Sequence, residues 1–295
     1  MMIIVPCFAH GDHAAIRHII ALHPRPLDMT RHTGQLVIVE NRTGAGGTIG
    51  MDSAMKSPPD GYTVLITNDN AASAPHIMNL KYDYTTEMLP VCYLGRHGQC
   101  LAVHSSLGVS SIQELVAHVK ANPGLGLATS GVGSNQHVLC EWFKREAGIQ
   151  LDHVPYRGAG AAISDLVFGH VKAAILGPTA ILPHYQAGTL KILAQSSAQR
   201  GQGMPEIPTF EEAGYKGLVL EAWYAAFAPQ GTPPAIIARL NGAMNKALTD
   251  PKLRDTFAKG ALETMGGPPE NIGQLARADS QKYARLVKEL NIRAN

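Results

Sequence analysis

The sequence predicts an α/β fold, and three observations lead to that prediction. Short apolar runs alternate along the chain with segments of helical periodicity. Several of these runs are continuously apolar, as the buried strands of a parallel sheet are. The length of 295 residues allows two domains of about 150 residues, and an apolar content of 45% is enough to fill a core.

The apolar runs predict strands, and the segments between them predict helices. We expect strands over residues 2–5, 36–39, 63–67, 101–103, 126–129, 173–176 and 191–195. The clearest helix follows Ser111, because Glu114 stands three residues later at the spacing of a capping box. Further helices are expected over 137–147, after a glycine-rich loop, and over 161–168.

The last quarter of the chain is predicted to be helical. Thr232 is expected to cap one helix, with Pro233 in its first position. A second helix begins at Asp250 and a third follows Pro268. Two remaining stretches, 85–106 and 221–231, are candidate crossovers between two lobes.

The charge balance excludes one large class of function. The chain has 25 Lys and Arg against 23 Asp and Glu, a formal net charge of +2, and no basic run. Proteins that bind nucleic acid through phosphate contacts normally carry more positive charge, so we expect no nucleic-acid partner. The chain also has no apolar run of about 18 residues, which a transmembrane helix needs.

The cysteines and glycines predict neither a metal nor a cofactor. The cysteines lie at positions 7, 92, 100 and 140, and no pair has the Cys-x-x-Cys spacing of a zinc site. We expect free thiols, most of them buried. Gln136 stands where a dinucleotide fingerprint needs Gly or Ala, and no P-loop is present.

Two loops are candidates for binding an anion. The segment 128–137 turns from a strand into a helix near Ser134, where unpaired amides and a positive dipole suit a carboxylate or a phosphate. A tight loop with a serine cap is an equally good interpretation. The segment 153–160 also enters a helix, and its Arg157 is either a ligand contact or, as we favour, a surface residue.

The segment His10-Gly-Asp-His13 is the least ordinary local pattern. Its side chains could ligate a metal or act as an acid or base beside Cys7. A loop of four residues rarely places three ligands around one ion, and no further ligand is identifiable. No Gly-x-Ser-x-Gly elbow is present, which disfavours an ordinary α/β-hydrolase.

Six ordered motifs together closely resemble the Bug-type solute receptors, the binding components of tripartite tricarboxylate transporters. The resemblance extends over about residues 35 to 295, and it includes Val-Glu-Asn-Arg and Gly-Ala-Gly-Gly within 39–50, Ser-Gly-Val-Gly-Ser over 130–134 and His-Val-Pro-Tyr-Arg-Gly over 153–158. The other motifs lie at 59–63, 205–214 and 228–233.

The resemblance implies a two-lobed periplasmic-binding-protein fold, type II-like, with a hinge and a ligand cleft between the lobes. Residues 1–100 and 225–295 would form the first lobe, and residues 101–224 the second. The protein would be a monomeric, non-catalytic receptor that captures a small carboxylate for the membrane components of a transporter. The family is periplasmic, but the start of this chain lacks the features of a signal peptide, so a cytoplasmic protein stays open.

The resemblance also implies ligand contacts by position. They fall on Phe8, Ala9, His10, Asn68, Asn70, Ser130, Gly133, Ser134, Asn135, Tyr156, Gly158, Ala159, Gly177, Thr179 and Trp223. No catalytic residue and no metal ligand is implied.

Two alternatives stay open. The family's first loop reads Pro-Phe-Ala-Pro-Gly-Gly, whereas this chain has Cys7 before Phe8 and His10 in place of the second proline. One alternative is therefore an enzyme on the same scaffold that uses Cys7, His10, Asp12 and His13. The other is an orphan or signalling receptor that serves no transporter.

Overall fold

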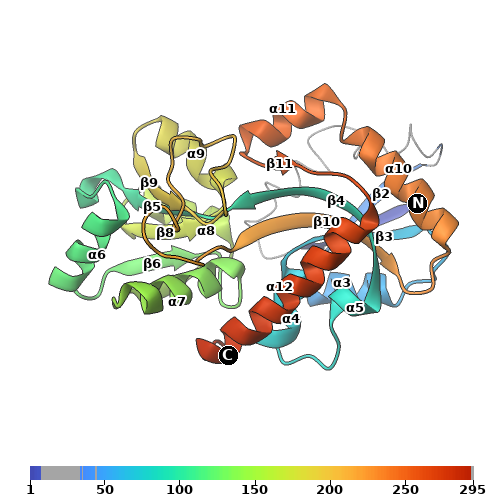
Figure 1. Ribbon diagram of the computed structural model, residues 1–295, viewed down its shortest axis with the longest axis horizontal. Helices are drawn as coiled ribbons and strands as arrows, with labels where there is room; N and C mark the ends of the chain where they lie inside the picture. Colours follow the sequence, from blue (N-terminus) through green and yellow to red (C-terminus); the bar gives the residue numbers. More distant parts are fainter. Residues whose placement is uncertain (8–33, 35, 44, 294–295) are drawn as a thin grey trace.

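The computed structural model describes residues 1–7, 34, 36–43 and 45–293, and their strands form two mixed sheets (Figure 1). The first sheet has the strand order β11-β4-β10-β3-β1-β2, and the second has the order β7-β6-β8-β5-β9. The strands of the first sheet are β1 (Met2–Cys7), β2 (Ile38–Thr43), β3 (Thr63–Asn68), β4 (Met88–Gly98), β10 (Glu221–Pro229) and β11 (Glu263–Thr264). Those of the second are β5 (Cys100–His104), β6 (Gly126–Thr129), β7 (Asp152–Pro155), β8 (Ala173–Leu176) and β9 (Leu190–Gln195).

Helices flank both sheets. In order along the chain they are η2 (Ala45–Gly47), α3 (Thr48–Met55), α4 (Asn70–Ile77), α5 (Tyr84–Glu87), η3 (Ser105–Leu107), α6 (Ile112–Ala121), α7 (Asn135–Ala147), α8 (Ala159–Val167), α9 (Pro178–Gln186), α10 (Pro234–Ala247), α11 (Pro251–Lys259) and α12 (Pro269–Glu289). We call the first sheet with α3–α5, α10 and α11 the first lobe, and the second sheet with α6–α9 the second lobe. The lobe boundaries expected from the sequence stay a prediction.

The chain passes between the lobes at two places. β4 ends at Gly98 and β5 begins at Cys100, so only Gln99 separates a strand of the first sheet from a strand of the second. The chain returns through β10, which pairs antiparallel with both β3 and β4. Figure 1 shows β4 and β10 side by side between the two groups of elements.

The expectation of parallel sheets is correct for some strand pairs and wrong for others. β1, β2 and β3 pair parallel, and so do β6, β7 and β8. β10 pairs antiparallel with its neighbours, however, and β5 pairs antiparallel with β8 and β9. A central strand is buried on both faces whichever way it runs, so its apolar run carries no information about direction.

Helix caps explain where several helices begin. Ser111 accepts a hydrogen bond from the Glu114 amide at 3.1 Å, and Ser134 accepts one from the His137 amide at 3.2 Å, as predicted. The expected cap at Thr232 is wrong. Its hydroxyl donates to the Pro229 carbonyl at 2.8 Å, so Pro233 takes the cap position and α10 begins one residue later than expected.

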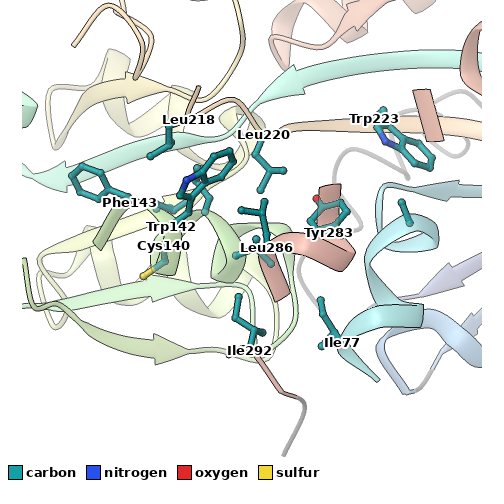
Figure 2. Packing of buried hydrophobic residues seen from close by; sticks show 14 of the residues in the cluster. Ile77, Cys140, Trp142, Phe143, Leu218, Leu220, Trp223, Tyr283, Leu286 and Ile292 are labelled. Carbon is teal, nitrogen blue, oxygen red and sulfur yellow. The ribbon is translucent and has the colours of Figure 1, made fainter. Parts of the chain in front are cut away.

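Helix α12 joins the cores of the two lobes. It packs against α4 and β4 of the first lobe and also contacts α7 of the second. Tyr283 and Leu286 are fully buried and belong to the same cluster as Trp142 of α7 and Ile77 of α4 (Figure 2). Because one continuous apolar cluster includes residues of both lobes, α12 connects them in addition to the two strand crossings.

Three cysteines are buried free thiols, which confirms the expectation for Cys92, Cys100 and Cys140. Burial raises the pKa of Cys92 and of Cys140 to about 12, so both stay protonated at neutral pH. The Cys7 side chain lies outside the part of the molecule that the structure describes.

Within the described residues, no helix has both the length and the apolar character required to span a membrane.

Candidate functional site

A small polar cavity lies between the two lobes, at the carboxyl ends of the parallel strands. Its volume is about 50 Å³, which leaves room for a few water-sized groups. In open α/β sheets, ligands bind outside the carboxyl ends of the strands. The first lobe contributes Asn68, Asp69, Asn70, His97, Ala222 and Tyr224 to the lining.

Four helices begin at this cavity. The first residue of α4, Asn70, lines it from the first lobe. In the second lobe α7, α8 and α9 follow β6, β7 and β8, and Asn135, Ala159 and Thr179 of their first turns line the same space. The positive dipole ends of these helices therefore face the same cavity, which is a favourable environment for an anion.

A chain of hydrogen bonds fixes the orientation of the Asn135 side chain. Gln136 accepts from the Ser130 hydroxyl and donates through Nε2 to Gln99 Oε1 at 3.3 Å. Gln99 Nε2 in turn donates to Asn135 Oδ1 at 2.9 Å. Since Oδ1 is the acceptor, Nδ2 remains as a donor. It lies close to the Asp69 carboxyl group but has no hydrogen-bond partner of normal geometry among the described residues, although Asn135 is only 4% exposed. A buried donor without a partner is costly, so this atom is a natural contact for a ligand oxygen.

Asp69 contributes a buried carboxyl group to the same cavity. Its Oδ2 accepts a hydrogen bond from the Tyr283 hydroxyl at 2.8 Å, and the side chain is 2% exposed. Burial raises the pKa of Asp69 to about 7, and the nearby carboxylate of Asp279 adds to the rise. The Asn135 amide lies close enough to favour the ionised form slightly. Asp69 therefore changes its charge near neutral pH.

His97 is a neutral hydrogen-bond acceptor in the cavity wall. Its Nδ1 lies 3.0 Å from the Gly98 carbonyl, which can only accept, so Nδ1 carries the proton. Its Nε2 is then the acceptor and lies 3.3 Å from the Tyr224 hydroxyl. Burial lowers the pKa of His97 to about 4. No Lys or Arg lines the cavity among the residues that the structure describes.

Seven of the site residues expected from the sequence line this cavity. They are Asn68, Asn70, Ser134, Asn135, Ala159, Gly177 and Thr179. The Thr179 hydroxyl also donates to the Gly260 carbonyl at 3.1 Å, which joins α9 of the second lobe to the end of α11 in the first.

Five expected site residues do not line the cavity, and each uses its donor group in a hydrogen bond within the protein. The Gly133 amide donates to His137 Nδ1 at 3.1 Å, and the Gly158 amide donates to the Ser130 carbonyl at 2.8 Å. The Tyr156 hydroxyl donates to Asp165 at 2.7 Å. The Ser130 hydroxyl donates to Gln136, as described above, and the fifth residue is Trp223.

Trp223 is the clearest difference from the expected site. It is 1% exposed, and its indole donates to Asp279 at 2.9 Å in the core. Successive side chains of a strand point to opposite faces, so its neighbour Tyr224 reaches the cavity and Trp223 does not. Phe8, Ala9 and His10, like Asp12 and His13, lie outside the described residues.

The expected contacts include Asn68 and Asn70 on either side of Asp69, but they do not include His97, Gln99 or Gln136. Asp69 lies between two asparagines that were selected, directly after a fully buried strand, and this position was the available signal. His97 and Gln99 lie where β4 passes into β5, in a stretch interpreted only as a crossover. Arg157 is exposed and does not line the cavity, which agrees with the favoured interpretation of a surface residue.

His137, Glu141 and His153 form a separate cluster beneath the glycine-rich loop. One ligand atom of each lies within 4.8 Å of the others. The two imidazole rings are stacked, with centroids 4.0 Å apart and an angle of 7° between the planes. A metal ion at about 2.0 Å from a histidine nitrogen lies in the plane of that ring. Because the two planes are parallel and separate, their lone pairs do not converge on one ion, and we assign the pair a packing role.

Comparison with known proteins agrees with this geometry. Residues 25–292 match the TctC family model, described as "Tripartite tricarboxylate transporter family receptor". Protein BugT of Bordetella pertussis is 36% identical over 261 residues, which cover 87% of this chain and 80% of BugT.

Solved structures share the fold over their whole length. The structure of the periplasmic binding protein BugD has a TM-score of 0.84 at 27% identity and covers 100% of this chain and 98% of its own. MatC from Rhodopseudomonas palustris, solved with bound malate, has a TM-score of 0.83 at 27% identity and covers 97% of this chain and 98% of its own. The predicted α/β periplasmic-binding-protein fold is confirmed.

Proposed function

This chain belongs to the tripartite tricarboxylate transporter receptor family and is a solute-binding receptor, and we propose that it captures a small carboxylate between its lobes. The observation that supports the carboxylate is the convergence of four helix starts on one polar cavity. Asn135 Nδ2, which has no hydrogen-bond partner of normal geometry in the described part of the chain, adds a specific contact for an oxygen. MatC, a structural neighbour, is a protein with bound malate.

We further propose that the receptor works as a monomer in the periplasm and hands its ligand to the membrane components of a transporter. Membership of a family of periplasmic receptors supports this proposal. Binding without chemical conversion is the expected activity. The three described cysteines have protonated thiols and do not line the cavity, and His97 is held as a hydrogen-bonded acceptor.

Thermal unfolding with a panel of mono-, di- and tricarboxylates tests the carboxylate. A ligand at a hundred times its Kd adds about 2.7 kcal/mol of stability. For a chain of this size the melting temperature then rises by several degrees, at roughly 2–4 °C per kcal/mol. The ligand is recovered and analysed by mass spectrometry, and we expect it unchanged. If no carboxylate raises the melting temperature, the proposal is wrong; conversion of the ligand would support the enzyme instead.

Two serine caps supply a matched pair of variants. Ser134→Ala removes the cap of α7 at the cavity, and Ser111→Ala removes the cap of α6 away from it. Each is expected to cost about 1 kcal/mol of stability. Only Ser134→Ala should also weaken carboxylate binding, by about tenfold. Equal effects of both variants on affinity would contradict the assigned position of the site.

A further inference from the structure

We propose that Ala261, in the turn between α11 and β11, is a positioning residue that holds the two lobes together at a point outside the ligand cavity. Its backbone belongs to the first lobe, whereas its methyl group packs with the second. This role goes beyond the proposed function, because it concerns the contact between the lobes and assigns no ligand. The backbone of the turn, the surroundings of the methyl group and the glycine that faces it support this role.

The backbone at Ala261 is left-handed, with φ at +51°, where α11 ends. Its amide donates three residues back, to the Ala258 carbonyl, and the following amide donates five residues back. Helices α7 and α9 end with the same pair of hydrogen bonds, but there Gly148 and Gly188 take the left-handed position. Glycine is usual in this position because other residues adopt the left-handed conformation only at a cost. Such strain persists where surrounding contacts compensate for it, and at Ala261 those contacts lie in the other lobe.

The methyl group of Ala261 packs against the core of the second lobe. The apolar cluster that it joins has all its buried members between Cys100 and Ile207. The next residue, Leu262, is instead buried in the cluster of the first lobe, together with Phe257 of α11. Adjacent residues of one turn are thus divided between the two cores, and Ala261 is partly buried at their boundary.

Gly203 of the second lobe faces Ala261 directly. A Cβ atom at position 203 would stand 2.7 Å from the Ala261 Cβ atom and 2.8 Å from its Cα atom. The backbone of Gly203 is not left-handed, so close approach to the turn is the reason for glycine there. The neighbouring Gly260 carbonyl accepts a hydrogen bond from the Thr179 hydroxyl of α9 at 3.1 Å. The turn therefore contacts two elements of the second lobe, and Figure 1 shows the end of α11 beside α9.

The two energetic effects of Ala261 act on different states of the molecule. The left-handed strain is present whether the lobes are together or apart, because the hydrogen bonds of the turn lie within the end of α11. The contact with Gly203 and with the second core exists only when the lobes are together. Alanine in place of glycine thus lowers the stability of every folded state but favours the one in which the ligand cavity is enclosed. Ala261 does not itself line that cavity.

Ala261→Gly separates the two effects. Without ligand, the variant should unfold at the same temperature as the parent or at a higher one, because the strain is released. Calorimetry uses the carboxylate that most raises the melting temperature of the parent. The Kd should be about four times that of the parent, which corresponds to about one buried methyl group.

Asn291→Gly is the matched control. Asn291 ends α12 in the same left-handed position and with the same pair of backbone hydrogen bonds, but its side chain is exposed. Its replacement releases strain of the same kind and removes no contact between the lobes. The Kd of this variant should equal that of the parent.

Gly203→Ala tests the same contact from the second lobe. The added methyl group conflicts with Ala261 only when the lobes are together. The Kd should therefore rise more than in Ala261→Gly, and small-angle X-ray scattering without ligand should show a larger radius of gyration. Gly242→Ala is the control, because Gly242 also has an ordinary backbone conformation and has nothing within 4 Å of its Cβ position. It should change neither value, and circular dichroism confirms that all variants are folded.

The outcomes separate this role from the proposed function. An unchanged Kd in Ala261→Gly, or a melting temperature that falls together with the affinity, would show that the methyl group only supports the turn. The role of Ala261 would then be wrong while the receptor stands. If no carboxylate binds the parent, the proposed function is wrong, and the scattering of Gly203→Ala still decides on Ala261. A larger radius of gyration would support the contact between the lobes, and an unchanged one would overturn it.

Discussion

Gly133 of the second lobe lies directly against Ile77 of the first. A Cβ atom at position 133 would stand 2.9 Å from Ile77 Cγ2, which is closer than side chains normally approach. The backbone of Gly133 is also left-handed, with φ at +81°. The glycine therefore permits the two lobes to meet beside the cavity, and its role is close approach and not ligand contact.

Gly133→Ala should hold the lobes apart at this point. The left-handed conformation costs an alanine about 1–2 kcal/mol, and the contact with Ile77 adds to that cost only when the lobes are together. We expect carboxylate affinity to fall about tenfold in calorimetry. Gly148→Ala is the control, since Gly148 is also left-handed but has nothing near its Cβ position. Restored affinity in Gly133→Ala with Ile77→Ala would identify the contact as the cause.

The sequence predicts those strands whose apolar pattern lies within a few consecutive residues. The strands at 126–129 and 173–176 have the expected bounds, because short apolar runs there end at loops. The sequence predicts only crossovers over 85–106 and 221–231, but β4 and β10 in these stretches are the longest strands that the structure describes. They carry polar residues such as Arg96 and Glu221 where they pass from one lobe to the other, and this mixed environment hides the strand pattern.

The candidate site likewise contains some features that the sequence predicts and others that depend on tertiary contacts. The helix start at Ser134 was predictable, because its cap and glycine-rich loop lie within a few residues. The partner of the buried Asp69 carboxyl group was not, since it is the Tyr283 hydroxyl, 214 residues away in the sequence. Trp223 and Tyr224 show a third limit. Which of two adjacent aromatic side chains faces the cavity depends on the register of β10 with β3 and β4, and this register is a tertiary property.

Leu286→Ala should destabilise the whole chain. Leu286 is 1% exposed and lies in the cluster that includes residues of both lobes (Figure 2). Truncation of a buried leucine to alanine costs about 2–5 kcal/mol, because contacts are lost and a cavity remains. Urea denaturation should show this loss as one transition. Leu275→Ala, on a partly buried position of the same helix, should cost less; an equal cost would contradict the central place of Leu286.

His97 should make the ligand-free protein less stable in mild acid. Its pKa is lowered from 6.5 to about 4 by burial, so the unfolded chain binds a proton more readily than the folded one. The stability that neutral His97 contributes is present above pH 6.5 and is lost as the pH falls toward 4, by about 3 kcal/mol in all. His97→Gln cannot titrate. In urea denaturation at pH 7 and pH 4.5, the variant should lose less stability than the parent; an identical loss would show that His97 is not responsible.

Asp69 should act on stability in the opposite direction. Its pKa is raised from 3.8 to about 7, so the folded protein holds a proton that the unfolded chain releases. The stability from the protonated group is fully present below pH 3.8 and is lost as the pH rises through 7, by about 4 kcal/mol in all. Tyr283 and Asp279 of α12 and Asn135 of α7 lie around this carboxyl group. None of the three is a cation that would lower the pKa of Asp69 below its usual value.

Asp69→Asn removes this dependence, because the amide stays neutral at every pH. The variant should therefore gain stability relative to the parent between pH 5 and pH 8, by several kcal/mol in urea denaturation without ligand. Asp279→Asn should reproduce only a small part of that gain, because it removes one contribution to the raised pKa of Asp69 and leaves the carboxyl group buried. A parent and a variant whose stabilities run parallel from pH 5 to pH 8 would show that Asp69 is ionised throughout, as an exposed aspartate is.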